Sequence, residues 1–196
     1  MWTVILKDFQ QGVATLGGGD INVAAGGDIT DLSLSTPTNG LYETDGSVVV
    51  RGGGDIDVYA GGDYLSPRLY ADGGTTRLRV LGDVSSGGSG LEAVIALGDA
   101  PVSIEAGGDI SIDGIGNITT LPMSTLQITA SSFASYFYNY GEASGIELLS
   151  HNGDVILNNQ FSDIQAAHGN FYSGVSGTPS QYWVSYPADL KVTTLN

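Results

Sequence analysis

Aspartate residues that directly follow glycine are the residues whose spacing most clearly suggests chemistry. Gly-Asp units recur in the same order along the chain, usually before an aliphatic residue. Carboxylates on neighbouring strands, about 5 Å apart, would bind Ca²⁺, act as a general acid and base, or accept backbone hydrogen bonds at a turn. The residues concerned are Asp20, Asp28, Asp55, Asp63, Asp83, Asp99, Asp109 and Asp154.

The order of residues favours the turn role over a metal site. The calcium-binding β-roll repeat has the order Gly-Gly-x-Gly-x-Asp and a nine-residue period, and neither is present. We therefore expect backbone capping and no metal or cofactor, with Asp55 and Asp57 as the place where Ca²⁺ would bind if it binds at all. The expected structural turn residues are Asp20, Asp28, Asp55, Asp63, Asp83, Asp109 and Asp154.

Aromatic residues gather in two clusters near the end of the chain. Aromatics with a polar group suit a flat platform on which sugar rings stack, and they equally suit packing at the end of a fold. The candidate ligand-binding residues are Tyr136, Tyr138, Tyr140, Tyr182, Trp183 and Tyr186. Packing and ligand binding both stay open for them.

Four of the six basic residues lie in one short stretch, as Arg51, Arg68, Arg77 and Arg79. Arg77 and Arg79 alternate with aliphatic residues, so both should point outward on a strand. We expect ion pairs with Asp57 or Glu92 on adjacent turns, each contributing little. The alternative is a site for a sulfated or acidic glycan.

Catalysis has the weakest support. Asp55, Asp57 and Asp83 could serve a polysaccharide lyase or hydrolase, but paired carboxylates are ordinary in so acidic a chain. His151 and His168 have neither a nucleophile motif nor metal-ligand spacing nearby. We expect no catalytic residues and no enzyme, with a polysaccharide-active enzyme as the alternative.

Composition excludes several classes of protein. The 196 residues include 30 glycines and no cysteine, and carry a net charge of −15, which disfavours nucleic acid and anionic membranes as partners. The hydrophobic fraction of 41 % argues against disorder of the whole chain. No signal peptide or membrane span is visible, so we expect a cytosolic protein or a slice of a longer one.

The Gly-Asp units that would position the aspartate and arginine side chains form a repeat. Residues 18–29 (GGDINVAAGGDI) return as residues 53–64 (GGDIDVYAGGDY), and a looser copy spans 97–110. Aliphatics alternate after each corner, as in Ile56 and Val58, which predicts short strands, and glycine with φ > 0 would close the corners. No apolar stripe of helical period exists. We predict an all-β parallel β-helix (β-solenoid) of about eight rungs with protruding loops such as residues 36–46.

The whole chain is expected to form one solenoid domain. Residues 1–115 would supply the rungs rich in Gly-Asp, and residues 116–196 the aromatic-rich rungs or a cap. The two ends of such a stack expose unpaired strand edges, so end-to-end self-association or contact with neighbouring solenoid segments is expected.

The repeated units, together with AGGDISI at 106–112 and NGDVILN at 152–158, resemble the passenger regions of filamentous haemagglutinin-like exoproteins. The resemblance covers most of residues 17–160. It implies a right-handed parallel β-helix that is exported by two-partner secretion, displayed on or shed from the bacterial surface, and used as an adhesin, stalk or fibre. A cell-surface glycan or host receptor is then the expected partner. The Asn-Pro-Asn motif of the family's secretion domain is absent, so an internal or C-terminal fragment is expected.

Overall fold

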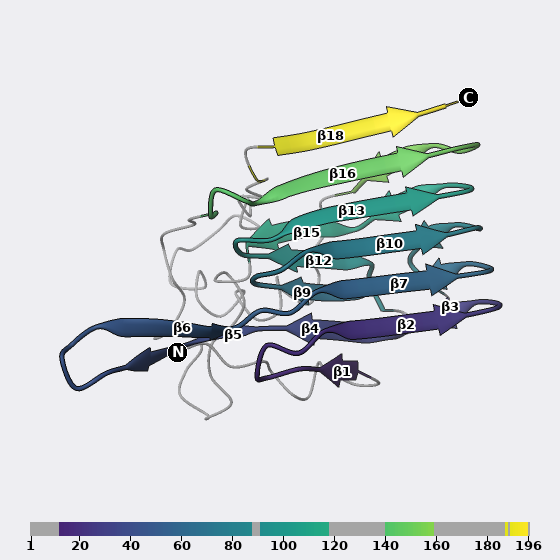
Figure 1. Ribbon diagram of the computed structural model, residues 1–196. Helices are drawn as coiled ribbons and strands as arrows, with labels where there is room; N and C mark the ends of the chain where they lie inside the picture. The colour runs from purple at the N-terminus through teal and green to yellow at the C-terminus, as the bar shows by residue number, and fades with distance from the viewer. Residues whose placement is uncertain (1–11, 88–90, 118–139, 159–186, 188, 196) are drawn as a thin grey trace, which may run out of the picture.

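Alternating aliphatic residues between glycine corners form strands throughout the described part of the chain. The computed structural model describes residues 12–87, 91–117, 140–158, 187 and 189–195. Within these ranges there are eighteen strands, and sixteen of them lie in three parallel sheets (Figure 1). The same ranges contain no helix of the length and apolarity that crossing a membrane requires. Over the described residues, the prediction of an all-β fold with parallel strands is confirmed.

The largest sheet, the six-stranded sheet, carries one strand of each successive turn of the chain. Its spatial order follows the sequence: β2 (Ile21–Ala25), β7 (Ile56–Ala60), β10 (Thr76–Val80), β13 (Pro101–Ala106), β16 (Gly145–Ser150) and β18 (Asp189–Thr194).

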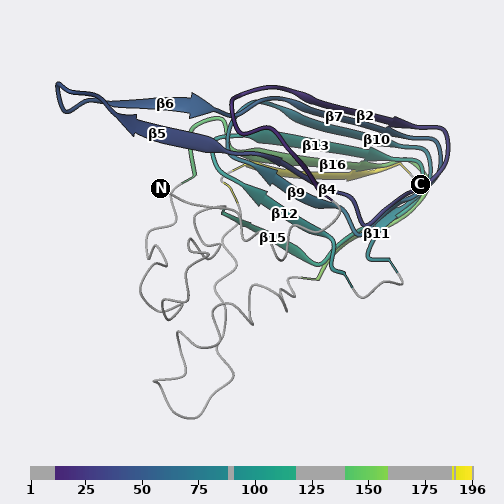
Figure 2. The same cartoon turned by 90° about the horizontal axis from the view of Figure 1, so that it is seen from below.

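Two further sheets complete each turn. The corner sheet contains β3 (Ile29–Thr30), β8 (Tyr64–Leu65), β11 (Val84–Ser85), β14 (Ile110–Ile112) and β17 (Val155–Leu157). The back sheet contains β1 (Gly12–Ala14), β4 (Ser33–Thr36), β9 (Arg68–Ala71), β12 (Val94–Leu97) and β15 (Gly114–Asn117). The chain passes from the six-stranded sheet to the corner sheet, then to the back sheet, and returns (Figure 2). This topology is compatible with a parallel β-helix.

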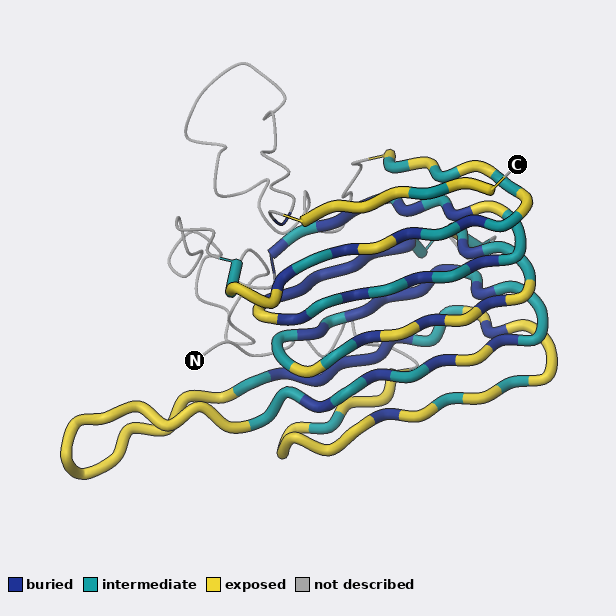
Figure 3. Tube along the Cα trace, turned by 45° about the horizontal axis from the view of Figure 1, so that its top comes forward, coloured by how far each residue is buried: buried dark blue, intermediate teal, exposed yellow. Residues whose placement is uncertain are grey.

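Strands of successive turns pair in register, so equivalent side chains stack. Ile56 pairs with Ile21 on one side and with Thr76 on the other, and Val58 pairs with Val23 and Leu78. The alternation predicted from the sequence places these aliphatics inside, where Ile56, Leu78 and Ile104 are at most 1 % exposed. The outward residues of the same strands are half-buried or exposed (Figure 3). One continuous core therefore runs along the stack.

In the back sheet, β4, β9, β12 and β15 are buried almost completely on both faces, whereas the end strand β1 is exposed. Leu34 and Leu69 point into the core and are fully buried, while the alternate residues Ser33, Ser35 and Arg68 are also at most 4 % exposed. A strand with only one buried face would leave such polar side chains in water. The six-stranded sheet is thus the one that offers a broad outward face.

The turns differ in length, and one insertion explains the first difference. Equivalent corner residues are separated by 35, 20, 26 and 45 residues in turn. Strands β5 (Thr38–Tyr42) and β6 (Val48–Gly52) form an antiparallel hairpin between β4 and β7, and it projects from the stack (Figures 1 and 3). The protrusion predicted at residues 36–46 is therefore a hairpin. The count of about eight rungs stays a prediction.

Candidate functional site

The Gly-Asp corners form a hydrogen-bonded ladder between turns, which we name the corner ladder. The carboxylate oxygen Oδ1 of Asp28 accepts a hydrogen bond from the backbone N–H of Asp63 at 2.9 Å. Asp63 accepts from Asp83, and Asp83 accepts from Asp109, both at 2.8 Å. Asp109 accepts from Asp154 at 2.8 Å. Asp63, Asp83 and Asp109 thus each accept through the side chain and donate through the backbone N–H. At the ends of the ladder, Asp28 only accepts and Asp154 only donates.

From the second corner of the ladder onward, the aspartate carboxylate of the preceding turn requires a glycine before the next aspartate. A Cβ atom on Gly62, Gly82, Gly108 or Gly153 would lie only 1.9 to 2.2 Å from Oδ1 of the aspartate in the preceding turn. None of these four glycines has a positive φ. The expectation that the glycine supplies φ > 0 is therefore wrong at these corners, because the constraint is close approach and not backbone conformation.

A second, shorter ladder lies at the corner before the six-stranded sheet. Asp20 Oδ1 accepts from the N–H of Asp55 at 2.9 Å, and Asp55 Oδ1 accepts from the N–H of Thr75 at 2.7 Å. Asp99 Oδ1 accepts from the N–H of Ala143 at 2.9 Å. We expected each carboxylate to cap donors within its own corner, but in these bonds the donor belongs to the next turn.

The outward face of the six-stranded sheet carries rows of charged side chains that pair across strands. Arg77 on β10 lies 3.7 Å from Asp57 on β7, as predicted, and Arg79 lies 3.9 Å from Glu105 on β13. Farther along the stack, Lys191 on β18 pairs with Glu147 on β16. The side chains of these pairs are roughly half exposed or more. Exposed pairs of this kind contribute up to about 1 kcal/mol each.

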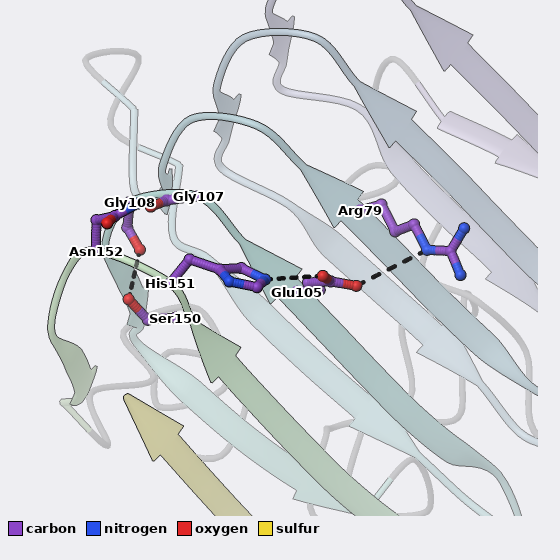
Figure 4. A network of polar contacts seen from close by, with 7 residues as sticks. All are labelled: Arg79, Glu105, Gly107, Gly108, Ser150, His151 and Asn152. Atoms are coloured by element: carbon purple, nitrogen blue, oxygen red, sulfur yellow. Dashed lines mark hydrogen bonds and ion pairs between the residues drawn. The ribbon is translucent and has the colours of Figure 1, made fainter. Parts of the chain in front are cut away.

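Glu105 also contacts His151, so three turns meet in one network (Figure 4). His151 Nε2 lies 2.8 Å from Glu105 Oε1, while Arg79 Nε faces the other carboxylate oxygen. Ser150 precedes this histidine but is turned into the corner. Its hydroxyl donates to the Gly108 carbonyl at 2.8 Å and accepts from the Gly153 N–H at 2.9 Å. The network therefore contains a carboxylate–imidazole pair. The hydroxyl of the adjacent Ser150 is bonded to the backbone of the corner and does not contact this pair.

A shallow depression of about 320 Å³ lies on the same face, near the first strand of the six-stranded sheet. Its lining residues come from β2, β7 and β10, and its outward side chains are Asn22, Ala24, Asp57, Tyr59, Arg77 and Arg79. Tyr59 is 43 % exposed. The depression combines an aromatic ring, an amide and two ion-paired guanidinium groups.

The predicted aromatic platform has one described residue. Tyr140 is half-buried and packs against the core, and burial raises the pKa of its hydroxyl well above the usual value. The structure thus assigns Tyr140 a packing contact. Tyr136, Tyr138, Tyr182, Trp183 and Tyr186 lie outside the described residues, as does His168.

The four clustered arginines do not converge on one surface. Arg51 lies on the hairpin strand β6 and is exposed, whereas Arg68 is buried on the back sheet. Only Arg77 and Arg79 share a face. Of the four arginines considered for an acidic-glycan site, only Arg77 and Arg79 could contribute to one surface. Each of these two already faces a carboxylate.

Asp55, Asp57 and Asp83, which the sequence analysis considered for catalysis or for Ca²⁺, do not form one cluster of carboxylates. Asp55 and Asp83 accept backbone N–H groups at different corners, while Asp57 points outward toward Arg77. Over the described ranges, no three or more His, Asp or Glu side chains gather in a way that could hold a metal ion.

Sequence reasoning did not name Tyr59, Asn22 or Glu105 as candidate site residues. A usable signal exists, because GGDIDVY at 53–59 aligns with GGTTRLR at 73–79 through the paired glycines. That alignment would have placed Asp57 beside Arg77 and Tyr59 beside Arg79, as the strand register does.

Comparison with known proteins adds no relative. No family model, no curated protein and no solved structure matches this chain.

Proposed function

We propose that this chain is a structural and adhesive segment of a secreted bacterial surface exoprotein. In this proposal it is a right-handed parallel β-helix of about eight rungs that serves as a rigid stalk or fibre and binds surface glycans. The corner ladder is the observation that carries the structural half. Four successive hydrogen bonds join five turns at one corner, in addition to the strand pairing. Repeated contacts between neighbouring turns give a quasi-one-dimensional body suited to reach and display.

The shape of the isolated protein tests this role. Small-angle scattering and negative-stain electron microscopy should give an elongated particle whose long axis is the stacking direction. A near-spherical particle with a folded circular-dichroism spectrum would contradict the proposal.

The end of the stack supports association with a further solenoid segment or a second copy. On β18 the inward residues Leu190 and Val192 are 39 % and 45 % exposed, whereas their neighbours Ile146 and Leu148 on β16 are at most 2 % exposed. An exposed strand edge with an apolar row invites pairing with another strand.

Sedimentation velocity tests this association. Val192→Lys should shift concentrated samples toward monomer, because a charge enters the apolar row. Val50→Lys, on the hairpin at 66 % exposure, is the matched control and should leave the distribution unchanged. Equal association in both variants would exclude this end as the contact.

A polysaccharide-active enzyme is the second candidate, and the contact between Glu105 and His151 at 2.8 Å is the observation that favours it. An exposed carboxylate–imidazole pair can transfer protons as a general acid or base. Reducing-sugar release from pectin-like and sulfated polysaccharides tests it. Turnover that disappears in Glu105→Gln would replace the structural proposal with the enzymatic one.

A further inference from the structure

The depression at Tyr59 arises because β2, β7 and β10 place side chains of different size next to one another. The register aligns Ala24 on β2 with Tyr59 on β7 and with Arg79 on β10. Since Ala24 has only a methyl group beside the tyrosine ring, the surface is hollowed there. Asn22 on β2 stands next to Asp57 in the adjacent row. The volume of about 320 Å³ lies at the lower end of the usual range for small-molecule sites, about 300–1,000 Å³.

Charge balance decides which ligand class suits this depression. The two guanidinium groups at the depression, Arg77 and Arg79, face the two carboxylates of Asp57 and Glu105, so the four formal charges cancel locally. The chain as a whole carries −15. An anionic ligand would therefore meet long-range repulsion without a local excess of positive charge. A cationic ligand would find each carboxylate already facing a guanidinium group, because Asp57 pairs with Arg77 and Glu105 pairs with Arg79.

We propose that this depression binds a neutral saccharide. A sugar ring presents an apolar face of C–H groups, which suits the exposed Tyr59 ring, and a rim of hydroxyls. Asn22 supplies both a donor and an acceptor, and the paired arginine and aspartate side chains supply fixed donors and acceptors for neighbouring hydroxyls. The inference deepens the glycan-binding half of the proposed function and rests on it.

Isothermal titration calorimetry with oligosaccharides of glucose, galactose and N-acetylglucosamine tests the site, with oligogalacturonate as the acidic probe. Tyr59→Ala should weaken binding of the neutral ligand at least about tenfold, because the stacking surface is lost. Tyr42→Ala is the matched control: Tyr42 is 82 % exposed on the hairpin, away from the depression. It should bind as the wild type does. Affinity for the neutral ligand should change less than about twofold between 50 and 300 mM salt, since no net charge is neutralised.

Three results would overturn the inference: no neutral probe binds, Tyr59→Ala binds as the wild type does, or only oligogalacturonate binds. Electron microscopy of the same samples separates this failure from failure of the structural role. Elongated particles without sugar binding refute the saccharide site alone. Compact particles that bind sugar through Tyr59 refute the stalk alone.

Discussion

The hairpin turn and the stack corners use glycine and aspartate in opposite orders, with different consequences. In the hairpin, Asp45 precedes Gly46, whose φ is +85°, and Asp45 accepts the N–H of Ser47 at 2.9 Å. The hydrogen bonds from Ser47 hold the pKa of Asp45 below its usual value. In the corner ladder, glycine comes first, and Asp63 accepts an N–H from Asp83, 20 residues later. An Asp-Gly turn closes on itself, whereas a Gly-Asp corner joins two turns.

The largest expected effect comes from filling the space of a ladder carboxylate. Gly108→Ala places a Cβ 1.9 Å from Asp83 Oδ1, so the carboxylate must move away and no longer accepts the hydrogen bond from the Asp109 N–H. We expect a loss of about 3 kcal/mol in the free energy of unfolding, measured by urea denaturation. Gly27→Ala is the matched control, because the space around that Cβ is open to 4 Å. It should change stability by at most about 0.5 kcal/mol. Equal losses would refute the steric explanation.

Removing a ladder carboxylate should cost less than displacing it. Asp83→Ala leaves the Asp109 N–H without its acceptor, and we expect a loss of about 2 kcal/mol, with Asp83→Asn losing about half of that. Asp45→Ala, in the hairpin, should leave the urea midpoint of the stack unchanged. The double variant Gly108→Ala/Asp83→Ala should lose less than the sum of the single losses, because both act on one contact. Additive losses would show that the two residues are not coupled.

A buried tyrosine in the stack should give it a sensitivity to alkali that the hairpin lacks. Tyr64 is fully buried, its hydroxyl donates to the Leu32 carbonyl at 2.8 Å, and burial raises its pKa far above the usual value. Because the folded pKa is the higher one, this stability is fully present below about pH 10, the unfolded pKa, and falls as the pH rises above it.

Tyr64→Phe should therefore cost about 1 kcal/mol at pH 8, through the lost hydrogen bond, and should lose less stability than the wild type above pH 10. Urea midpoints at several pH values measure both effects. Tyr42→Phe, on the exposed hairpin, should follow the wild type throughout. A parallel pH dependence in Tyr64→Phe would contradict the assignment to this residue.

The smallest effect is expected from shortening the hairpin. Replacing residues 42–48 by Asn-Gly keeps the Leu41–Val49 pair and supplies a two-residue hairpin turn. Because these residues are exposed, thermal unfolding followed by circular dichroism should shift by no more than about 2 °C. The hydrogen bonds at the hairpin base are left in place: the Thr38 N–H donates to the Asp72 carboxylate, and the Gly53 N–H donates to the Pro37 carbonyl. A large shift would mean that the hairpin supports the stack.

Local pattern predicted the strands and their parallel pairing, because the Gly-Asp units and the alternation around Ile56 and Val58 are visible in any one turn. It did not predict the partner of each carboxylate. Which N–H meets Asp63 depends on stacking across 20 residues, and the spacing varies from turn to turn. Burial of Arg68 was missed because the covering of a sheet's outer face leaves no trace in a single strand's sequence.

The candidate binding site was less predictable still. Tyr59 looks like an ordinary outward residue of a strand, and its depression exists because Ala24 occupies the adjacent position one turn earlier. The aromatic-rich segments drew attention through composition, yet Tyr140, the described member, packs against the core. Site prediction in such a chain needs the register between turns before residue type becomes informative.

The corner ladder has a direction. Each carboxylate from Asp28 to Asp109 accepts a hydrogen bond from a backbone N–H that comes later in the chain, and Asp154 supplies the last donor. A nascent or translocating chain that emerges amino terminus first would therefore present a prepared acceptor to every following turn. Such a polypeptide can fold turn by turn as it leaves a ribosome or a pore, with each completed turn acting as the template for the next one.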